Sequence, residues 1–301
     1  PAEPGELALE VTVRGNGEDT RARLRVPVRP VLPARTQVTS GRMDQATMSF
    51  PGASDVFEPG TVRRTVMVGS APTVAFAGRL RDLLRYPYGC LEQTVSQAFP
   101  LLTLRDLAAS LEPELIGRAD PAALVQSAIR RMAAMQVPSG GFGMWPDARV
   151  SNPWASLYAT HFLVEAQDAG YSVDYGLLER ALGYTGRIVQ ARAQYGNEEL
   201  EQIAYALYIL ARAERAEVAT MNFLRDRPPA NLGRSSRALL AAALALSGDE
   251  RGLAGLEESI REGDAAAKVA DGRANLGSPL RDRALLLVAL LDASPESPRV
   301  L

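Results

Sequence analysis

Residues 86–94 read Tyr-Pro-Tyr-Gly-Cys-Leu-Glu-Gln-Thr, and they lie within the helical pattern that decides the fold of this chain. Pro87 disfavours helix at the residue before it, and Gly89 lets the backbone turn sharply just ahead of Cys90. A helix can therefore begin near Cys90, and apolar residues three and four apart continue it over residues 95–111. The segment predicts a tight turn that leads directly into a helix.

The same helical period recurs in most of the remaining chain. The predicted helices cover residues 76–84, 95–111, 122–135, 154–169, 175–191, 200–213, 235–246, 251–260 and 282–291. Asp120-Pro121 and Asn152-Pro153 each place a capping side chain before a proline at the first helical position. Helical hairpins joined by short loops predict a mainly α fold, and the lack of a strict repeat favours an α/α toroid over a regular solenoid.

The first 70 residues follow a different pattern. Apolar and polar residues alternate over residues 7–13 and 21–26, and Gly15-Asn16-Gly17 between them predicts a β-hairpin. A further strand pair is predicted at residues 46–50 and 61–68. The N-terminal segment is therefore expected to be β-rich.

Composition excludes several classes of protein. The 301 residues are 47% hydrophobic and 23% charged with a formal net charge of −2, which gives no general attraction to nucleic acid or to a membrane surface. No apolar run reaches the ~18 residues that span a bilayer. One cysteine and one histidine exclude an internal disulfide and a zinc site, so no metal and no cofactor is predicted. The N-terminus lacks the features of a signal peptide, and we expect the chain to begin inside a larger protein.

The lone cysteine is either a buried packing residue or a reactive one. Residues three apart on a helix have Cβ atoms roughly 5–6 Å apart, so the thiol of Cys90 can meet the side-chain carbonyl of Gln93. A helix N-terminus favours the thiolate form, which is the form that attacks a carbonyl. These conditions suit an intrachain thioester, formed when the thiolate displaces ammonia from the glutamine amide and protected from water by burial.

The run Tyr-Gly-Cys-Leu-Glu-Gln-Thr resembles the thioester motif of the α2-macroglobulin and complement family, Gly-Cys-x-Glu-Gln, and the longer run from Tyr86 resembles its bacterial branch. A second run, Gly-Gly-Phe-Gly-Met-Trp-Pro at residues 140–146, resembles another segment of the same domain. The resemblance implies a thioester domain with an α/α-toroid fold over residues 71–301. It also implies that residues 1–30 end a macroglobulin-like β-domain and that residues 31–70 begin a CUB-like β-domain.

The resemblance gives individual roles to the motif residues. Cys90 would supply the sulfur of the thioester and Gln93 its acyl carbon, with Gly89 and Glu92 flanking them. Glu92 lies on a different face of the helix from the Cys90–Gln93 pair, which leaves it at most a local electrostatic role.

Two further residue types matter for the reactivity that the family implies. In bacterial relatives a tyrosine of this segment shields the thioester together with a methionine from a later domain; Tyr86 matches it, with Tyr88 as the alternative. Some complement relatives use a histidine to redirect reaction toward hydroxyls, but the matching region near residues 193–199 contains none. The resemblance therefore implies reaction with amines, meaning lysines, and His161 is expected to pack in the core.

The family implies a protease-trapping inhibitor and not an enzyme. Cleavage of a bait region elsewhere exposes the thioester, which then captures a lysine of the attacking protease. The expected partners are therefore attacking proteases and the remaining domains of a larger chain, with no nucleic acid and no direct membrane contact. By the same resemblance the protein would act in bacterial defence in the periplasm, with the parent chain lipid-anchored to the inner membrane.

Two enzymatic alternatives stay open. A glycoside hydrolase or lyase on an α/α toroid needs paired carboxylates, for which Asp147 and Glu165 are candidates. A cysteine hydrolase would combine Cys90 with His161 and an orienting partner that the sequence does not identify. Only the thioester hypothesis predicts a chain that is lighter by one ammonia.

Overall fold

A computed structural model describes residues 5–28, 89–111, 120–190, 196–230, 232–252, 254–255 and 279–295, together with some residues between 35 and 69. The chain divides into two compact units, Pro1–Gly78 and Arg79–Leu301.

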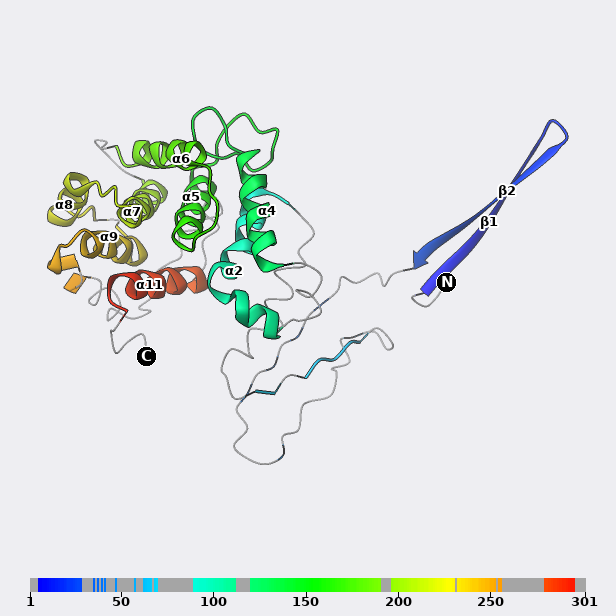
Figure 1. The fold of residues 1–301 in the computed structure, drawn as a ribbon, viewed down its shortest axis with the longest axis horizontal. Coiled ribbons are helices and arrows are strands. Elements are labelled where there is room, and N and C mark those ends of the chain that lie inside the picture. The colour runs from blue at the N-terminus through cyan, green and yellow to red at the C-terminus, as the bar shows by residue number, and fades with distance from the viewer. Residues whose placement is uncertain are drawn as a thin grey trace. The chain divides into compact units, whose positions relative to one another are not determined.

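The first unit contains a β-hairpin at the predicted place. Strands β1 (Gly5–Gly15) and β2 (Glu18–Val28) pair antiparallel and form a two-stranded sheet (Figure 1). The turn between them is Asn16-Gly17, whose φ angles are 51° and 80°. Positive φ at both central residues matches the right-handed twist of the flanking strands, and Asn-Gly adopts it at little steric cost.

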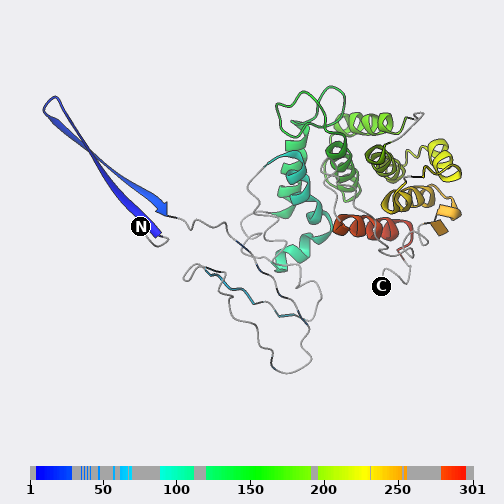
Figure 2. The same ribbon diagram turned by 180° about the vertical axis from the view of Figure 1, so that it is seen from behind.

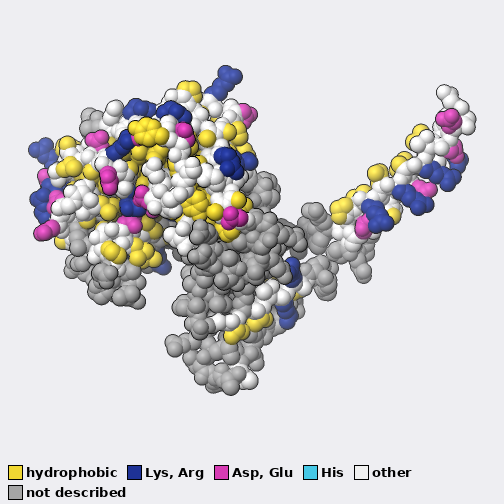
Figure 3. All heavy atoms as spheres, viewed as in Figure 1, with side chains coloured by type: hydrophobic (Ala, Val, Ile, Leu, Met, Phe, Trp, Pro, Cys, Tyr) yellow, Lys and Arg dark blue, Asp and Glu magenta, His cyan; other side chains and the backbone are white. Residues whose placement is uncertain are grey.

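The register of the hairpin separates an apolar face from a charged one. Leu9 lies opposite Leu24, while Glu10 lies opposite Arg23 and accepts a hydrogen bond from its Nε at 3.3 Å. The described residues bury neither face: Leu9 is 42% exposed and Leu24 is 53% exposed, and apolar and charged side chains of the hairpin are both visible in Figure 3. Alternation therefore gives the hairpin an apolar face and a charged face, but among the described residues nothing covers either face.

The second predicted strand pair is wrong in the part that can be checked. Residues 62–66 and 68 have no regular secondary structure, and most of residues 46–50 lie outside the described part of the chain. An alternating pattern defines two faces, but a strand also needs a partner that accepts and donates its ladder hydrogen bonds.

The second unit is helical. Its described helices are α2 (Leu91–Leu111), α4 (Pro121–Ala133), α5 (Pro153–Asp168), α6 (Tyr175–Ile188), α7 (Asn197–Arg212), α8 (Val218–Asp226), α9 (Arg234–Leu246) and α11 (Pro279–Ala293). All except α8 were predicted to within a few residues. The predicted helix at 251–260 is helical at residues 251–252 and 254–255, and the one at 76–84 lies outside the described residues.

The two predicted proline-led caps are confirmed. Asp120 Oδ1 accepts from the Ala122 N–H at 3.0 Å, and Asn152 Oδ1 accepts from the Ala155 N–H at 2.9 Å. Each side chain satisfies a first-turn N–H that has no partner inside the helix, which fixes where α4 and α5 begin.

The described helices form an inner and an outer row (Figures 1 and 2). Helices α2, α5, α7, α9 and α11 contact one another in that order, whereas α4 packs on α2, α6 on α5 and α7, and α8 on α9. The inner helix α5 buries ten of its sixteen residues, but the outer helix α6 buries five of fourteen. A helix covered on several sides is apolar nearly all round, and one covered on a single side is amphipathic. The fold is therefore mainly α with a small two-stranded sheet.

Candidate functional site

Cys90 and Gln93 lie together at the beginning of α2. Cys90 directly precedes the helix and Gln93 is its third residue. The main-chain N–H of Cys90 donates to Gln93 Oε1 at 3.4 Å, and Cys90 is only 8% exposed. Oε1 is bonded to the acyl carbon of the glutamine side chain, so this contact folds that carbon back toward Cys90. The three-residue spacing thus brings the Gln93 side chain to the main chain of Cys90, and the bond between the two side chains stays a prediction.

Contacts around the helix N-terminus hold Cys90 in place. The N–H of the next residue, Leu91, donates to the Met144 carbonyl at 2.9 Å. The hydroxyl of Thr94 donates to the carbonyl of Cys90, also at 2.9 Å. The first N–H groups of a helix lack partners within it, and here a distant main-chain carbonyl and a glutamine side chain supply them.

The Met144 carbonyl belongs to the second segment that carried the family resemblance, residues 140–146. Gly140 in this segment has a φ of +85°, and a Cβ atom there would lie 2.3 Å from the Arg180 carbonyl oxygen. Phe142 is fully buried. The glycine lets the chain turn tightly against α6, and the phenylalanine anchors the segment in the core, so that Met144 reaches the start of α2. The two resemblance segments are therefore parts of one site.

Arg131 is a residue of this site that the sequence did not reveal. Its Nε and Nη2 atoms both donate to the carbonyl of Gly89, at 3.1 and 2.8 Å. Arg131 stands in the last turn of α4, where a basic residue is ordinarily a solvated partner of the helix C-terminus. The two residues are 42 positions apart, and no local pattern links them.

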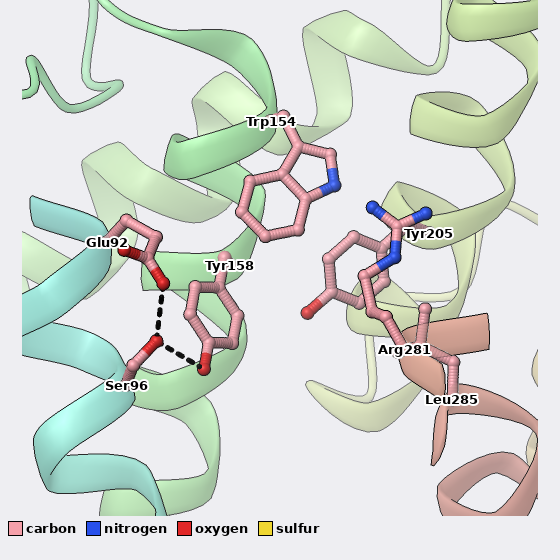
Figure 4. A pocket seen from close by; sticks show the side chains of 7 residues that line it. All are labelled: Glu92, Ser96, Trp154, Tyr158, Tyr205, Arg281 and Leu285. Atoms are coloured by element: carbon pink, nitrogen blue, oxygen red, sulfur yellow. Dashed lines mark hydrogen bonds between the residues drawn. The ribbon is translucent and has the colours of Figure 1, made fainter. Parts of the chain in front are cut away.

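Glu92 forms a hydrogen bond with Ser96, one turn later on α2. Its carboxylate accepts from the Ser96 hydroxyl at 2.7 Å, and Ser96 in turn lies 3.3 Å from the Tyr158 hydroxyl. Glu92 lines a pocket that neither Cys90 nor Gln93 lines (Figure 4). These contacts are in keeping with the expectation that Glu92 lies on a different helix face from Cys90 and Gln93, which stays a prediction.

That pocket has a volume of about 250 Å³ and lies among α2, α5, α7 and α11. Its lining residues are Glu92, Ser96, Trp154, Tyr158, Tyr205, Arg281 and Leu285 (Figure 4). Burial raises the pKa of the Tyr158 hydroxyl, the hydrogen bond with Ser96 opposes this, and the charge of Glu92 adds to it. The Arg281 guanidinium lies 5.7 Å from the centre of the Trp154 ring and is hydrogen-bonded to Glu201.

The pocket does not have the carboxylate pair that a glycoside hydrolase needs. Among its described lining residues Glu92 is the only carboxylate. The two candidates named from the sequence lie elsewhere: Asp147 is exposed on a loop, and Glu165 accepts from Arg212 Nε at 2.9 Å.

His161 belongs to a buried polar network on the inner helices. Its Nδ1 lies 2.9 Å from the Tyr205 hydroxyl, and its Nε2 lies 3.6 Å from Glu165 Oε1. Burial raises the pKa of Glu165, but the hydrogen bonds and charges of His161 and Arg212 outweigh it and hold this pKa below its ordinary value. Both ring nitrogens face partners other than Cys90. This agrees with the packing role predicted for His161 and gives no support to a cysteine hydrolase.

The remaining predicted residues cannot be placed. Tyr86 and Tyr88 lie outside the described residues, so their shielding role stays a prediction.

Within the described part of the chain, no group of three or more His, Cys, Asp or Glu residues could hold a metal ion. No helix in that part is both long enough and apolar enough to cross a membrane.

Comparison with known proteins finds relatives along nearly the whole chain. No protein-family model matches it. The α2-macroglobulin of Xylella fastidiosa (strain Temecula1 / ATCC 700964) is 31% identical over 291 residues, which cover 93% of this chain and 18% of that protein. The chain thus spans about a fifth of the length of this curated relative.

Solved structures of the same kind of protein share the fold. Salmonella α2-macroglobulin reacted with methylamine matches 74% of this chain and 15% of its own, with a TM-score of 0.62 and 29% identity. Escherichia coli α2-macroglobulin activated by porcine elastase matches 71% of this chain and 20% of its own, with a TM-score of 0.58 and 30% identity. Related in sequence over most of its length and in fold over about three quarters of it, the chain belongs to the bacterial α2-macroglobulin family.

Proposed function

We propose that this chain is the thioester-bearing part of a bacterial α2-macroglobulin, and that a bond between Cys90 and Gln93 captures attacking proteases covalently. The observation that carries the proposal is the hydrogen bond from the Cys90 N–H to Gln93 Oε1, at 3.4 Å, beside a cysteine that is 8% exposed. It supports the two requirements of a stored thioester, a glutamine acyl group folded back onto the cysteine residue and protection from bulk water.

The chemistry balances within the two side chains. The Cys90 sulfur bonds to Cδ of Gln93, the C–N bond of the amide breaks, and the nitrogen leaves as ammonia with the thiol proton. Later a primary amine attacks the same carbon, the C–S bond breaks, and Cys90 regains its proton as a free thiol. The acyl group is consumed once, so the chain acts as a single-use acyl donor and not as an enzyme.

The relatives support amines and proteases as the reacting partners. The Salmonella protein was solved after reaction with methylamine, a small primary amine, and the E. coli protein after activation by elastase, a protease. A lysine side chain on a protease surface presents the same primary amine. We therefore assign capture to lysines of attacking proteases, triggered by cleavage of a bait region outside this chain.

Further assignments rest on membership of the family. The two rows of helices support an α/α-toroid thioester domain over residues 71–301, and the hairpin supports the end of a macroglobulin-like β-domain at residues 1–30. Residues 31–70 would begin a CUB-like domain. The whole protein would act in bacterial defence as a broad-spectrum inhibitor in the periplasm, lipid-anchored to the inner membrane, with its remaining domains as partners of this part.

The intact mass of the native protein tests the proposal. We expect a mass lower by one ammonia than the sequence requires, and no titratable thiol from the single cysteine. Methylamine should release one thiol and become attached to Gln93. Gln97, one turn later on the same helix, provides the matched control: Gln93→Ala should abolish the mass deficit, whereas Gln97→Ala should keep it.

One result of the same experiment would contradict the thioester proposal. A Cys90 thiol that titrates fully in fresh, folded, untreated protein, while Gln93 is still glutamine, would rule the thioester out. Glutamate at position 93 would instead show that a thioester had formed and had been hydrolysed.

A further inference from the structure

The peptide bond between Gly89 and Cys90 is hydrogen-bonded at both ends. At one end its carbonyl oxygen, on Gly89, accepts two bonds from the Arg131 guanidinium, at 3.1 and 2.8 Å. At the other end its N–H, on Cys90, donates to Gln93 Oε1 at 3.4 Å. A cation, a peptide group and the glutamine carbonyl oxygen thus form one chain of hydrogen bonds.

We infer that Arg131 is a positioning residue for the thioester: it fixes and polarises the Gly89–Cys90 peptide so that the Cys90 N–H stabilises charge on Gln93 Oε1. This inference rests on the proposed function. It gives the reaction an oxyanion-stabilising donor and gives Arg131 a role that acts through that donor.

Every reaction at the acyl carbon places negative charge on the same atom, Oε1 of Gln93. When sulfur or an amine adds to Cδ of Gln93, the C=O π electrons move to Oε1, and the oxygen becomes an oxyanion until the leaving group departs. An N–H already aimed at this oxygen stabilises the transition state more than the ground state, which is the condition for acceleration. The contact of 3.4 Å is longer than the common ~2.9 Å, and such bonds tighten when the oxygen gains charge.

Arg131 strengthens this donor in two ways. Its two N–H groups converge on a single oxygen, so the plane of the peptide is held and the Cys90 N–H keeps its direction. Hydrogen bonds in a chain also polarise one another, by ~10–30% per bond, so a cation at the carbonyl end makes the N–H end a better donor. A lysine ammonium would keep the charge but lose the planar fork.

The glycine before the cysteine fits the same arrangement. A Cβ atom at Gly89 would lie 2.2 Å from Nη2 and 2.6 Å from Cζ of Arg131, so a side chain there would push the guanidinium away. Gly89 does not have a left-handed φ, and its backbone conformation is therefore open to other residues. Close approach of Arg131, and not backbone strain, is the reason for glycine at this position.

The test uses the whole protein with Arg131→Met, Arg131→Lys and, as a matched control, Arg130→Met on the neighbouring exposed residue of α4. Removing one direct oxyanion donor slows an acyl transfer about 100- to 1000-fold, and Arg131 acts one bond further away, so we expect methylamine to release the thiol about tenfold more slowly in Arg131→Met. Arg131→Lys should fall between this variant and wild type. Arg130→Met should match wild type.

A second readout reports on the hydrogen bond itself. With ¹³C-labelled glutamine, infrared difference spectra before and after methylamine isolate the thioester carbonyl stretch. Loss of polarisation at the N–H should move this stretch to higher frequency in Arg131→Met. A contact that only stabilised the fold would leave it unchanged.

The direction of the rate change separates the possible roles. If Arg131 merely closed the site, its removal would admit water and amines, and opening would become faster; that result, or an unchanged rate, overturns the inference. A folded variant without a thioester supports the inference if Gln93 is still glutamine, and overturns it if Gln93 has become glutamate. If Arg131→Met does not fold, Arg131→Lys decides alone, and wild-type rates in it refute the role. A wild-type protein without a thioester would refute the proposed function as well.

Discussion

Gly89→Ala is the substitution that most directly probes the site. The added methyl group would stand 2.2 Å from Arg131 Nη2, which is too close for any real contact. The obstructing atoms are the far end of a flexible, exposed side chain, so the guanidinium can swing into solvent without disturbing the core. The backbone at Gly89 has no left-handed φ and accepts alanine. The expected result is a folded protein that has lost the Arg131 hydrogen bonds to the Gly89 carbonyl.

The cost to stability should be small. The two hydrogen bonds from Arg131 involve a charged donor, but the donor is exposed to water and screened, so their joint net contribution is about 1 kcal/mol. For a helical unit of this size, a loss of about 1 kcal/mol lowers Tm by roughly 2–4 °C. The effect on the reaction rate should be larger. We expect methylamine to open the thioester about tenfold more slowly, as in Arg131→Met.

A double-mutant cycle tests whether Gly89→Ala and Arg131→Met act through the same lost hydrogen bonds. In an Arg131→Met background the alanine methyl group has no guanidinium to displace, so Gly89→Ala should add almost nothing to either the rate or the Tm. Thiol release after methylamine addition and thermal unfolding are measured on the same four proteins. Additive effects of the two substitutions on the rate would show that Gly89 acts independently of Arg131, and the reasoning would have to be abandoned.

Three further predictions concern shielding, packing and the trap. Tyr86→Ala in the whole protein should speed spontaneous hydrolysis of the thioester more than Tyr88→Ala does; equal rates in both variants and in wild type would remove shielding from this segment. Phe142→Ala should lower the free energy of unfolding by roughly 3–5 kcal/mol in urea titrations, because the ring is fully buried, and a loss under about 1 kcal/mol would contradict that packing. The whole protein should protect a large protein substrate from a captured protease while a small chromogenic peptide is still cleaved, and Cys90→Ala should abolish the covalent adduct. Stoichiometric loss of peptide cleavage would point to direct active-site inhibition instead of a trap.

Elements whose causes are local could be read from the sequence. Alternating residues around Asn16-Gly17 specified the hairpin, since turn chemistry and strand twist act within a few residues. Helical period and the caps at Asp120 and Asn152 specified the helices for the same reason. The short helix α8 was missed because it buries only Met221 and Leu224 among its nine residues and its start has no capping side chain.

The candidate site likewise combines features that have local causes with features that depend on tertiary packing. The hydrogen bond from the Cys90 main chain to the Gln93 side chain follows from one helical turn, so the motif alone determined it. The contact of Arg131 with the Gly89 carbonyl depends on how α4 packs on α2 and on the path of the chain before Cys90. Which residues of two distant segments meet depends on the whole core, and no local pattern in either segment predicts it.

The sequence by itself therefore determined that Cys90 and Gln93 are neighbours, because helix geometry places residues three positions apart side by side. Tertiary structure decided what surrounds these two residues: the Met144 carbonyl at the helix start, the Arg131 guanidinium at Gly89, and the enclosure that leaves Cys90 8% exposed. The physical reason is the separation along the chain between the residues that interact. A single turn of helix is specified by its own residues, whereas a guanidinium reaches a carbonyl 42 residues away only after apolar surfaces have packed the helices together.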